Sequence, residues 1–259
     1  MDIIVLLKQV PATETSVSIA EDRKRINPDD VKWVMNPYDE FAVEEALQMK
    51  QKHGGTVTIL SMGTDKVVEA IRTGLAMGAD KGILIKDPAL ADCDGLGTAR
   101  VLAAALKEMP HDVVIAGQRA MDDDNYLVGP AVAEFLGIPH ISMVIEETVE
   151  DGKIRCRRTV EGGTVVFEAP LPVLFTTQRG LNEPRYASLP GIMKAKKKPV
   201  ETKTLAEIGL SPETVAPMVE ITEMRTPPER TGGQIIDGAS AAEKAETLVA
   251  LLQENAKVI

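Results

Sequence analysis

Short apolar runs and amphipathic stretches alternate along the first half of the chain. Residues 3–7 are continuously apolar, the pattern of a strand that is buried on both faces of a sheet. The same reasoning predicts strands at residues 56–60, 82–85 and 113–115, and helices at residues 37 to about 54, 65–77, 98–106 and 129–136. This alternation predicts an α/β fold, with a doubly wound, mostly parallel sheet covered by helices on both faces.

The first predicted helix begins at a recognisable start signal. Asn36 can cap the helix, Pro37 occupies its first position, and Asp39 and Glu40 lie near its positive end. Apolar side chains then recur at near-helical spacing until Gly54 and Gly55. The sequence therefore predicts a helix from Pro37 to about Gly54.

The pattern changes after residue 140. Strands are predicted at residues 141–147, 153–160 and 164–168, with glycine turns between them that are typical of antiparallel hairpins. Residues 171–176 are again mostly apolar, so we expect this strand to return to the main sheet.

Regular periodicity fades from about Gln178 onward. Seven of the sixteen prolines lie there, and a last amphipathic helix is predicted at residues 241–253. A long extended stretch is unusual inside a compact domain, so this region is better explained as an arm that lies on another protein chain.

Composition narrows the class of protein. The 259 residues are 44% hydrophobic, and 29 basic and 39 acidic side chains give a net charge of −10. This charge argues against general binding to nucleic acid or to anionic membranes. The two cysteines make no disulfide framework, no apolar run approaches about 18 residues, and the chain starts directly with a strand. We expect a cytoplasmic protein without membrane insertion.

The candidate ligand loops are those at the carboxyl ends of the predicted strands, at residues 8–13, 61–65 and 117–125. In the last of these, backbone N–H groups before a helix are suited to a phosphate, with help from Asn125. Three adjacent aspartates would repel a phosphate unless they point away or cap the helix, so an ordinary capped turn is the alternative. The loop lacks the P-loop and G-x-G-x-x-G patterns, and consecutive aspartates diverge too much for a metal site.

A second segment, residues 181–198, combines apolar and basic side chains. Leu189, Ile192 and Met193 precede four lysines within residues 194–198. Exposed apolar groups beside charges suit transient docking, whereas the alternative is a packed loop whose lysines only solubilise it. The three histidines are isolated and no Cys/His cluster or G-x-S-x-G elbow occurs, so the residues do not favour an enzyme.

Several motifs together resemble one family. They are Leu7-Lys8-Gln9-Val10, Met35-Asn36-Pro37-Tyr38, residues 73–80, the three aspartates at residues 122–124 and the segment 181–198. Over nearly its whole length the chain resembles the β subunits of electron-transfer flavoproteins. The resemblance implies a Rossmann-like, adenine-nucleotide-binding fold and a heterodimer with a larger α subunit that holds most of the FAD.

The resemblance also implies an AMP site with a structural role in this chain. Carried over residue by residue, the site comprises Leu6, Asn36, Pro37, Tyr38, Asp39, Met62, Gly117, Gln118, Arg119, Ala120, Met121, Asp122, Asp123, Asp124, Asn125, Tyr126, Leu127 and Val128. Tyr38 would approach the flavin ring of the α subunit.

In the same family, the second segment is the recognition loop for acyl-CoA dehydrogenases. It implies partner contacts at Tyr186, Leu189, Pro190, Ile192 and Met193, with Leu189 as the anchor. The expected function is an electron carrier of fatty-acid β-oxidation that delivers electrons to a membrane quinone oxidoreductase. We accordingly expect a nucleotide-binding domain at residues 1–180, and a recognition loop and C-terminal arm on the α subunit at residues 181–259.

Two other functions stay open. Val128-Gly129-Pro130 also occurs in the electron-bifurcating branch of the family, whose β subunit holds a second FAD and whose complex oxidises NADH. That branch usually has Asp-Gly-Asp-Thr at residues 122–125 and lacks the Asn-Glu-Pro-Arg-Tyr signature found here, which favours AMP. A stand-alone nucleotide-binding regulator of the universal-stress type would be a monomer or homodimer, and the C-terminal arm argues against it.

Overall fold

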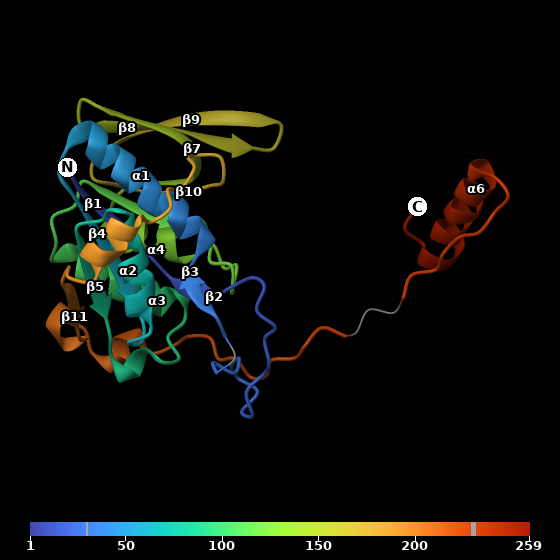
Figure 1. Cartoon of the computed structure of the whole chain (residues 1–259), viewed down its shortest axis with the longest axis horizontal. Coiled ribbons are helices and arrows are strands. Elements are labelled where there is room, and N and C mark those ends of the chain that lie inside the picture. Colours follow the sequence, from blue (N-terminus) through green and yellow to red (C-terminus); the bar gives the residue numbers. More distant parts are fainter. Residues whose placement is uncertain (30, 229–231) are drawn as a thin grey trace. The chain divides into compact units, whose positions relative to one another are not determined.

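A nine-stranded sheet forms the centre of the chain's larger unit. The computed structural model describes residues 1–29, 31–228 and 232–259, which divide into the units Met1–Thr222 and Glu223–Ile259. The sheet has the order β11-β5-β4-β1-β6-β10-β7-β8-β9 (Figure 1). Its strands are β1 Asp2–Leu6, β4 Thr56–Met62, β5 Lys81–Ile85, β6 Val113–Gly117, β7 His140–Glu150, β8 Lys153–Val160, β9 Gly163–Pro170, β10 Val173–Thr177 and β11 Val200–Lys203.

The sheet is parallel from β11 to β7 and continues as an antiparallel meander through β8 and β9. Strand β10 lies between β6 and β7 and runs parallel to both. The predicted return of residues 171–176 to the main sheet is therefore confirmed, as are the α/β class and the antiparallel excursion.

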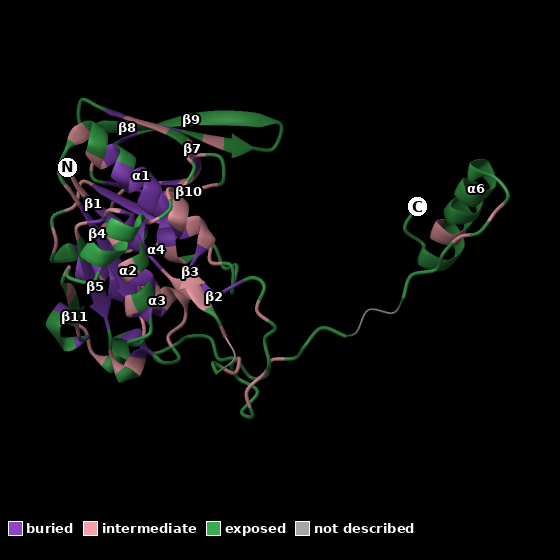
Figure 2. Cartoon of the chain, viewed as in Figure 1, coloured by how far each residue is buried: buried purple, intermediate pink, exposed green. Residues whose placement is uncertain are grey.

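Two apolar cores cover the two faces of the sheet. The helices are α1 Pro37–His53, α2 Val67–Met77, α3 Gly95–Lys107 and α4 Val128–Leu136. Ile3 and Val5 of β1 belong to the core that α1 and α2 cover, whereas Ile4 and Leu6 belong to the core that α3 and α4 cover. Successive side chains of a strand point to opposite faces, so a continuously apolar strand requires helices on both faces (Figure 2).

Some short elements were not predicted. Strands β2 Gln9–Pro11 and β3 Trp33–Met35 pair antiparallel beside the main sheet. After residue 178 the chain forms helix α5 Leu189–Ala195, strand β11 and two short 3-10 helices, Ala206–Ile208 and Pro212–Val215, and a further 3-10 helix lies at Pro88–Leu90. These elements span three to seven residues, too short for a periodic pattern.

The unit Glu223–Ile259 contains helix α6 Ala241–Leu251, which ends in a π-helical turn at Leu252–Ala256. Ser240 caps α6 by accepting a hydrogen bond from the backbone N–H of Glu243. The helix predicted at residues 241–253 is thus present, and α6 buries none of its side chains (Figure 2). Whether residues 181–259 lie on an α subunit stays a prediction. No helix within the described ranges is long and apolar enough to span a bilayer.

Candidate functional site

A cavity of about 250 Å³ lies at the carboxyl ends of β1, β4 and β6. This is the edge at which open α/β sheets hold their ligands. Its walls come from the ends of the three strands, the start of α1, the first turns of α3 and α4, and the loop before α4. The lining residues are Leu6, Leu7, Lys8, Asn36, Asp39, Met62, Cys93, Gly95, Thr98, Leu102, Ala116, Gly117, Gln118, Arg119, Ala120, Asp123, Asn125, Leu127, Val128 and Gly129.

The structure brings most of the predicted nucleotide-site residues together at this cavity. Those that line it are Leu6, Asn36, Asp39, Met62, Gly117, Gln118, Arg119, Ala120, Asp123, Asn125, Leu127 and Val128. Those that do not are Pro37, Tyr38, Met121, Asp122, Asp124 and Tyr126. Several of the second group support the loop from outside, as described below.

The prediction missed one wall of the cavity. Cys93, Gly95 and Thr98 follow β5, a strand whose end was not among the candidate loops. Because β5 is parallel to β4, its carboxyl end opens on the same edge of the sheet. The strand-end rule would have found this wall if it had been applied to β5.

Gly117 allows α1 and β6 to approach each other closely. A Cβ atom at this position would lie 2.2 Å from Asp39 Oδ1 and 2.8 Å from the Cβ of Tyr38. Only glycine fits without a backbone shift, because a close approach of two backbones leaves no room for a side chain.

Asp39 ties three segments of the cavity wall together. Its carboxylate accepts hydrogen bonds from the backbone N–H of Lys8 at 2.7 Å, from Asn36 Nδ2 at 3.0 Å and from the backbone N–H of Gly117 at 3.1 Å. Burial raises the pKa of this carboxyl to about 7, against the opposing effect of the hydrogen bonds. Asp39 therefore fixes the ends of β1 and β6 relative to the first turn of α1.

Asn36 stands at the N-cap position of α1, but the predicted capping by its side chain is wrong. Its Nδ2 donates to Asp39 and to the carbonyl oxygen of Arg119 at 2.9 Å, and its Oδ1 accepts from the backbone N–H of Met121. The side chain turns away from the helix because the loop after β6 offers it both a donor and an acceptor. Asn36 thus holds that loop instead of the helix end.

The three adjacent aspartates are paired with cations. Lys8 Nζ lies 2.8 Å from Asp122 Oδ1 and 3.1 Å from Asp123 Oδ2, and Arg119 Nη1 lies 2.5 Å from Asp124 Oδ1. They do not cap α4, whose N-cap position is Leu127. The described residues contain no cluster of His, Cys, Asp or Glu side chains that could hold a metal ion.

The first turn of α4 opens on the cavity through Val128 and Gly129. Unpaired backbone N–H groups and the helix dipole make such an end attractive to anions. Asn125, which we expected to help with a phosphate, lines the cavity but donates from Nδ2 to Asp123 and accepts at Oδ1 from the N–H of Leu127. The anion-binding potential thus resides in the backbone.

The predicted recognition segment contains a short helix that displays apolar side chains. Tyr186 is 98% exposed, Leu189 80% and Met193 61%, with Pro190 and Ile192 also exposed. Residues from Leu189 to Ala195 form α5, where we expected a loop. Ser188 caps this helix by accepting a hydrogen bond from the N–H of Gly191, and Pro190 lies in its first turn.

Helix α2 holds α5 in place. Arg72 Nη1 donates to the carbonyl oxygen of Ala195 at 2.7 Å, and Ala195 is buried. Lys198 Nζ donates to the carbonyl oxygens of Leu75 and Ala79 at the end of α2, where a cation is favourable. Lys198 is therefore a structural cap, and only the exposed Lys194, Lys196 and Lys197 remain as a solvated charge run.

Helix α1 holds the start of the same segment. The Arg185 guanidinium pairs with both carboxylate oxygens of Glu44, whose side chain is 5% exposed, at 2.7 and 2.9 Å. Asn182 Nδ2 donates to the carbonyl oxygen of Phe41 and to Glu45. The apolar side chains thus stand on a segment that is fixed at both ends.

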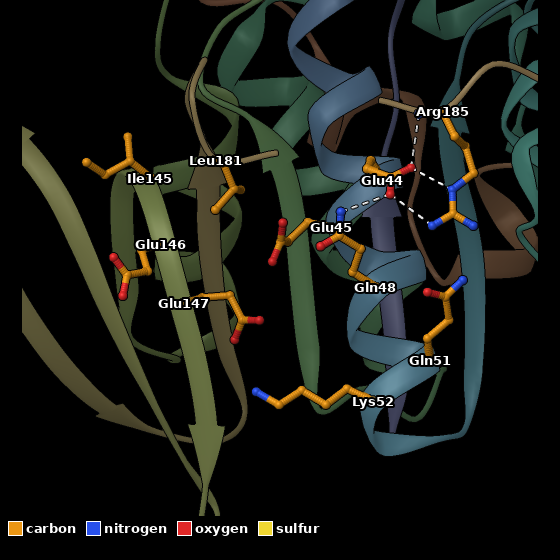
Figure 3. Close-up of a pocket in the computed structure, with 10 residues that line it drawn as sticks. All are labelled: Glu44, Glu45, Gln48, Gln51, Lys52, Ile145, Glu146, Glu147, Leu181 and Arg185. Carbon is orange, nitrogen blue, oxygen red and sulfur yellow. Dashed lines mark hydrogen bonds and ion pairs between the residues drawn. The ribbon is translucent and has the colours of Figure 1, made fainter. Parts of the chain in front are cut away.

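A second cavity, of about 670 Å³, lies between α1 and β7 (Figure 3) and was not predicted. Glu45 of α1 and Glu147 of β7 point toward each other across it. Burial raises the pKa of both carboxyls, that of Glu45 to about 7, and the negative charge of Glu147 raises the pKa of Glu45 further. This open cleft lies away from the carboxyl ends of the parallel strands.

Known proteins resemble this chain over its whole length. Residues 25–208 match the family model of the electron transfer flavoprotein domain. The chain is 40% identical to an electron transfer flavoprotein subunit beta of Bacillus subtilis (strain 168), with all of both chains covered. It is 36% identical to the human subunit beta, over 99% of this chain and 98% of the human one. It is 37% identical to subunit CarD of the caffeyl-CoA reductase–Etf complex of Acetobacterium woodii, over 98% of each chain. The chain belongs to the electron-transfer flavoprotein family, among its β subunits.

Proposed function

We propose that this chain, with its α subunit, carries electrons from acyl-CoA dehydrogenases to a membrane quinone oxidoreductase in the cytoplasm. Family membership makes it a carrier subunit of a flavin-containing complex. In our proposal the α subunit holds most of the FAD, and this chain supplies the dehydrogenase-docking segment and an AMP site. The observation that carries the proposal is the apolar surface of α5 and the residues before it.

That surface has the properties of a transient docking site. Large apolar side chains that are mostly exposed, such as Tyr186 and Leu189, mark interaction sites on otherwise polar surfaces. The patch is small, which suits a weak and short-lived complex. Its attachment to α1 and α2 limits the ordering cost of docking. A carrier that must dock, accept electrons and leave requires this combination.

The cavity at the sheet edge supports a mononucleotide as its ligand. Its volume of about 250 Å³ lies below the roughly 300–1,000 Å³ typical of sites for drug-sized ligands, so AMP fits the space better than a dinucleotide. The first turn of α4 would hold the phosphate through backbone N–H groups. The apolar Leu6, Met62 and Leu102 would cover the base.

Substitution of the anchor tests the docking proposal. Leu189→Ala in the complex should weaken electron acceptance from an acyl-CoA dehydrogenase by roughly tenfold in kcat/KM, mainly through KM, because a buried anchor contributes about 1–2 kcal/mol. Flavin content should stay unchanged. Val166→Ala, which truncates another exposed apolar side chain, on β9, is the matched control. Loss of flavin, or an unchanged kcat/KM, would contradict the assignment of the anchor.

The second candidate is a β subunit of an electron-bifurcating complex with a second FAD. The Val128-Gly129-Pro130 sequence at the start of α4 and the similarity to CarD favour it. Such a complex should reduce its flavin rapidly with NADH, whereas the carrier should not.

A further inference from the structure

Arg119 lines the sheet-edge cavity and is also the centre of a group of contacts with residues that do not line it. Its Nη1 pairs with Asp124 at 2.5 Å and its Nη2 donates to Tyr38 Oη at 3.0 Å. The guanidinium also lies over two aromatic rings, 4.9 Å from the centroid of Tyr38 and 5.8 Å from that of Tyr126. Both distances are within the range of cation–π attraction. One side chain thereby connects the loop before α4 to the first turn of α1.

The loop that Arg119 holds has an unfavourable backbone conformation. Asp124 and Tyr126 have φ angles of 51° and 56°, in the left-handed region that residues other than glycine rarely adopt. Such conformations persist only where surrounding contacts enforce them. Asp124 and Tyr126 are also the two loop residues that contact Arg119.

The side chains of the loop alternate between two sides. Asp123, Asn125 and Leu127 line the cavity, whereas Asp124 and Tyr126 do not and contact Arg119 instead. The contacts of Asp124 and Tyr126 with Arg119 therefore determine the orientation of the side chains that line the cavity and face its ligand. Tyr126 and Leu127 are partly exposed, so little packing assists Arg119 in this.

The charges of the loop make the same contacts relevant to an anionic ligand. Lys8 compensates Asp122 and Asp123, and Arg119 compensates Asp124. Without the guanidinium, Asp124 would add an unpaired negative charge beside the site. A phosphate held by the first turn of α4 would then be repelled.

We propose that Arg119 is a positioning residue for the nucleotide: it keeps residues 120–127 against α1 and so slows the escape of a bound nucleotide. This inference rests on the proposed AMP site. According to this inference, the Arg119 side chain determines how long AMP stays bound.

The test measures AMP dissociation from the complex of the full chain with its α subunit. We expect Arg119→Gln to release AMP about tenfold faster, because the substitution removes two cation–π contacts and an ion pair that hold the loop. Arg119→Lys should retain part of the effect, because the ammonium restores the charge next to Asp124 but not the planar stack. Tyr126→Ala, which removes one partly exposed ring, should also accelerate release, by a smaller factor. The complex is loaded with labelled AMP and mixed rapidly with excess unlabelled AMP. The loss of bound label over time gives the dissociation rate.

Two controls separate positioning from a general structural role. Arg25→Gln, at an exposed pair with Asp22 away from the cavity, should leave the rate unchanged. The thermal unfolding midpoint of the nucleotide-free complex is measured for wild type and Arg119→Gln, because the contacts of Arg119 also exist without AMP, and the dissociation rates are compared at a temperature at which both complexes are folded. If Arg119→Gln and Tyr126→Ala both release AMP within twofold of the wild-type rate, the inference is wrong. A wild-type complex that binds no AMP would instead overturn the proposed function.

Discussion

At the residue scale, the sheet-edge cavity depends on a few side chains that join distant segments. Asp39 connects the ends of β1 and β6 to α1, and Asn36 connects α1 to the loop after β6. Both use acceptors and donors of the main chain. Such buried networks are costly to disturb, because a lost partner leaves a buried polar group unsatisfied.

Gly117 lies at the tightest point of this network. Gly117→Ala should destabilise the complex by about 1–3 kcal/mol, because the added methyl group would overlap Asp39 Oδ1 and displace the first turn of α1. Urea-induced unfolding measures the loss. Gly163→Ala, on β9 and with open space around it, should change the free energy of unfolding by a few tenths of a kcal/mol. Equal effects of the two substitutions would contradict the steric account.

At the element scale, two carboxyl groups face each other where α1 lies beside β7, the strand that leads into the antiparallel part of the sheet. Glu45 accepts a hydrogen bond from Asn182 at 2.7 Å and points toward Glu147 of β7 (Figure 3). Glu44 on the same helix raises the pKa of Glu45 further, whereas Lys52 and His53 lower that of Glu147. Burial raises the pKa of the Cys156 thiol of β8, and the charges of Glu147 and Glu45 raise it further, to about 12.

This pair predicts a specific dependence of stability on pH. The folded-state pKa of Glu45, about 7, lies above its usual 4.5, so its favourable contribution is complete below the usual value and is lost as the pH rises through about 7. Glu45→Gln cannot ionise and keeps an acceptor for Asn182. Relative to wild type it should gain about 1–2 kcal/mol of unfolding free energy between about pH 5 and about pH 8.

The control is Glu168→Gln, at an exposed pair with Lys153. Contact with Lys153 lowers the pKa of Glu168, so this variant should show no pH-dependent difference from wild type over the same range. If the difference in unfolding free energy between Glu45→Gln and wild type is the same at about pH 5 and about pH 8, Glu45 ionises normally and the prediction is wrong.

The sequence predicted elements with a marked apolar pattern better than elements without one. Strands such as β1 and β10 carry continuous apolar runs whose burial on two faces requires a central place in the sheet, so their positions followed from pattern. Helix α5 and strand β11 have no such pattern. Helix α5 is held because Arg72 of α2 donates to the carbonyl oxygen of Ala195 and Lys198 donates to the carbonyl oxygen of Ala79 just after α2. Strand β11 forms because it pairs with the edge of β5. Neither kind of partner is visible in the local sequence.

The same distinction applies to the candidate site. The loops at strand ends were predictable from the order of strands and helices, and most of the residues inferred by resemblance meet at one cavity. The roles of Asn36 and of the three aspartates were not predictable, because their partners Arg119, Met121 and Lys8 become neighbours only through the fold. The cavity wall formed by residues after β5 was missed because the end of that strand was not included among the candidate loops.

At the scale of the whole molecule, helix α6 of the unit Glu223–Ile259 has no core of its own. Helix α6 has eleven residues and the unit buries none of them, although Leu248 and Val249 are apolar and exposed. An isolated helix shorter than about 12–15 residues is marginal in water. We therefore expect α6 to be covered in the complex, and its position on the α subunit stays a prediction.

The nucleotide content of the complex tests the central claim most directly. The chain is co-expressed with its α subunit, the purified complex is denatured, and the released FAD and AMP are separated by chromatography and quantified per heterodimer. Equal amounts of FAD and AMP, one of each, are the result that an electron carrier with a mononucleotide in the sheet-edge cavity predicts. Two FAD without AMP would contradict it, and would assign this protein to the electron-bifurcating branch, with NADH as its reductant.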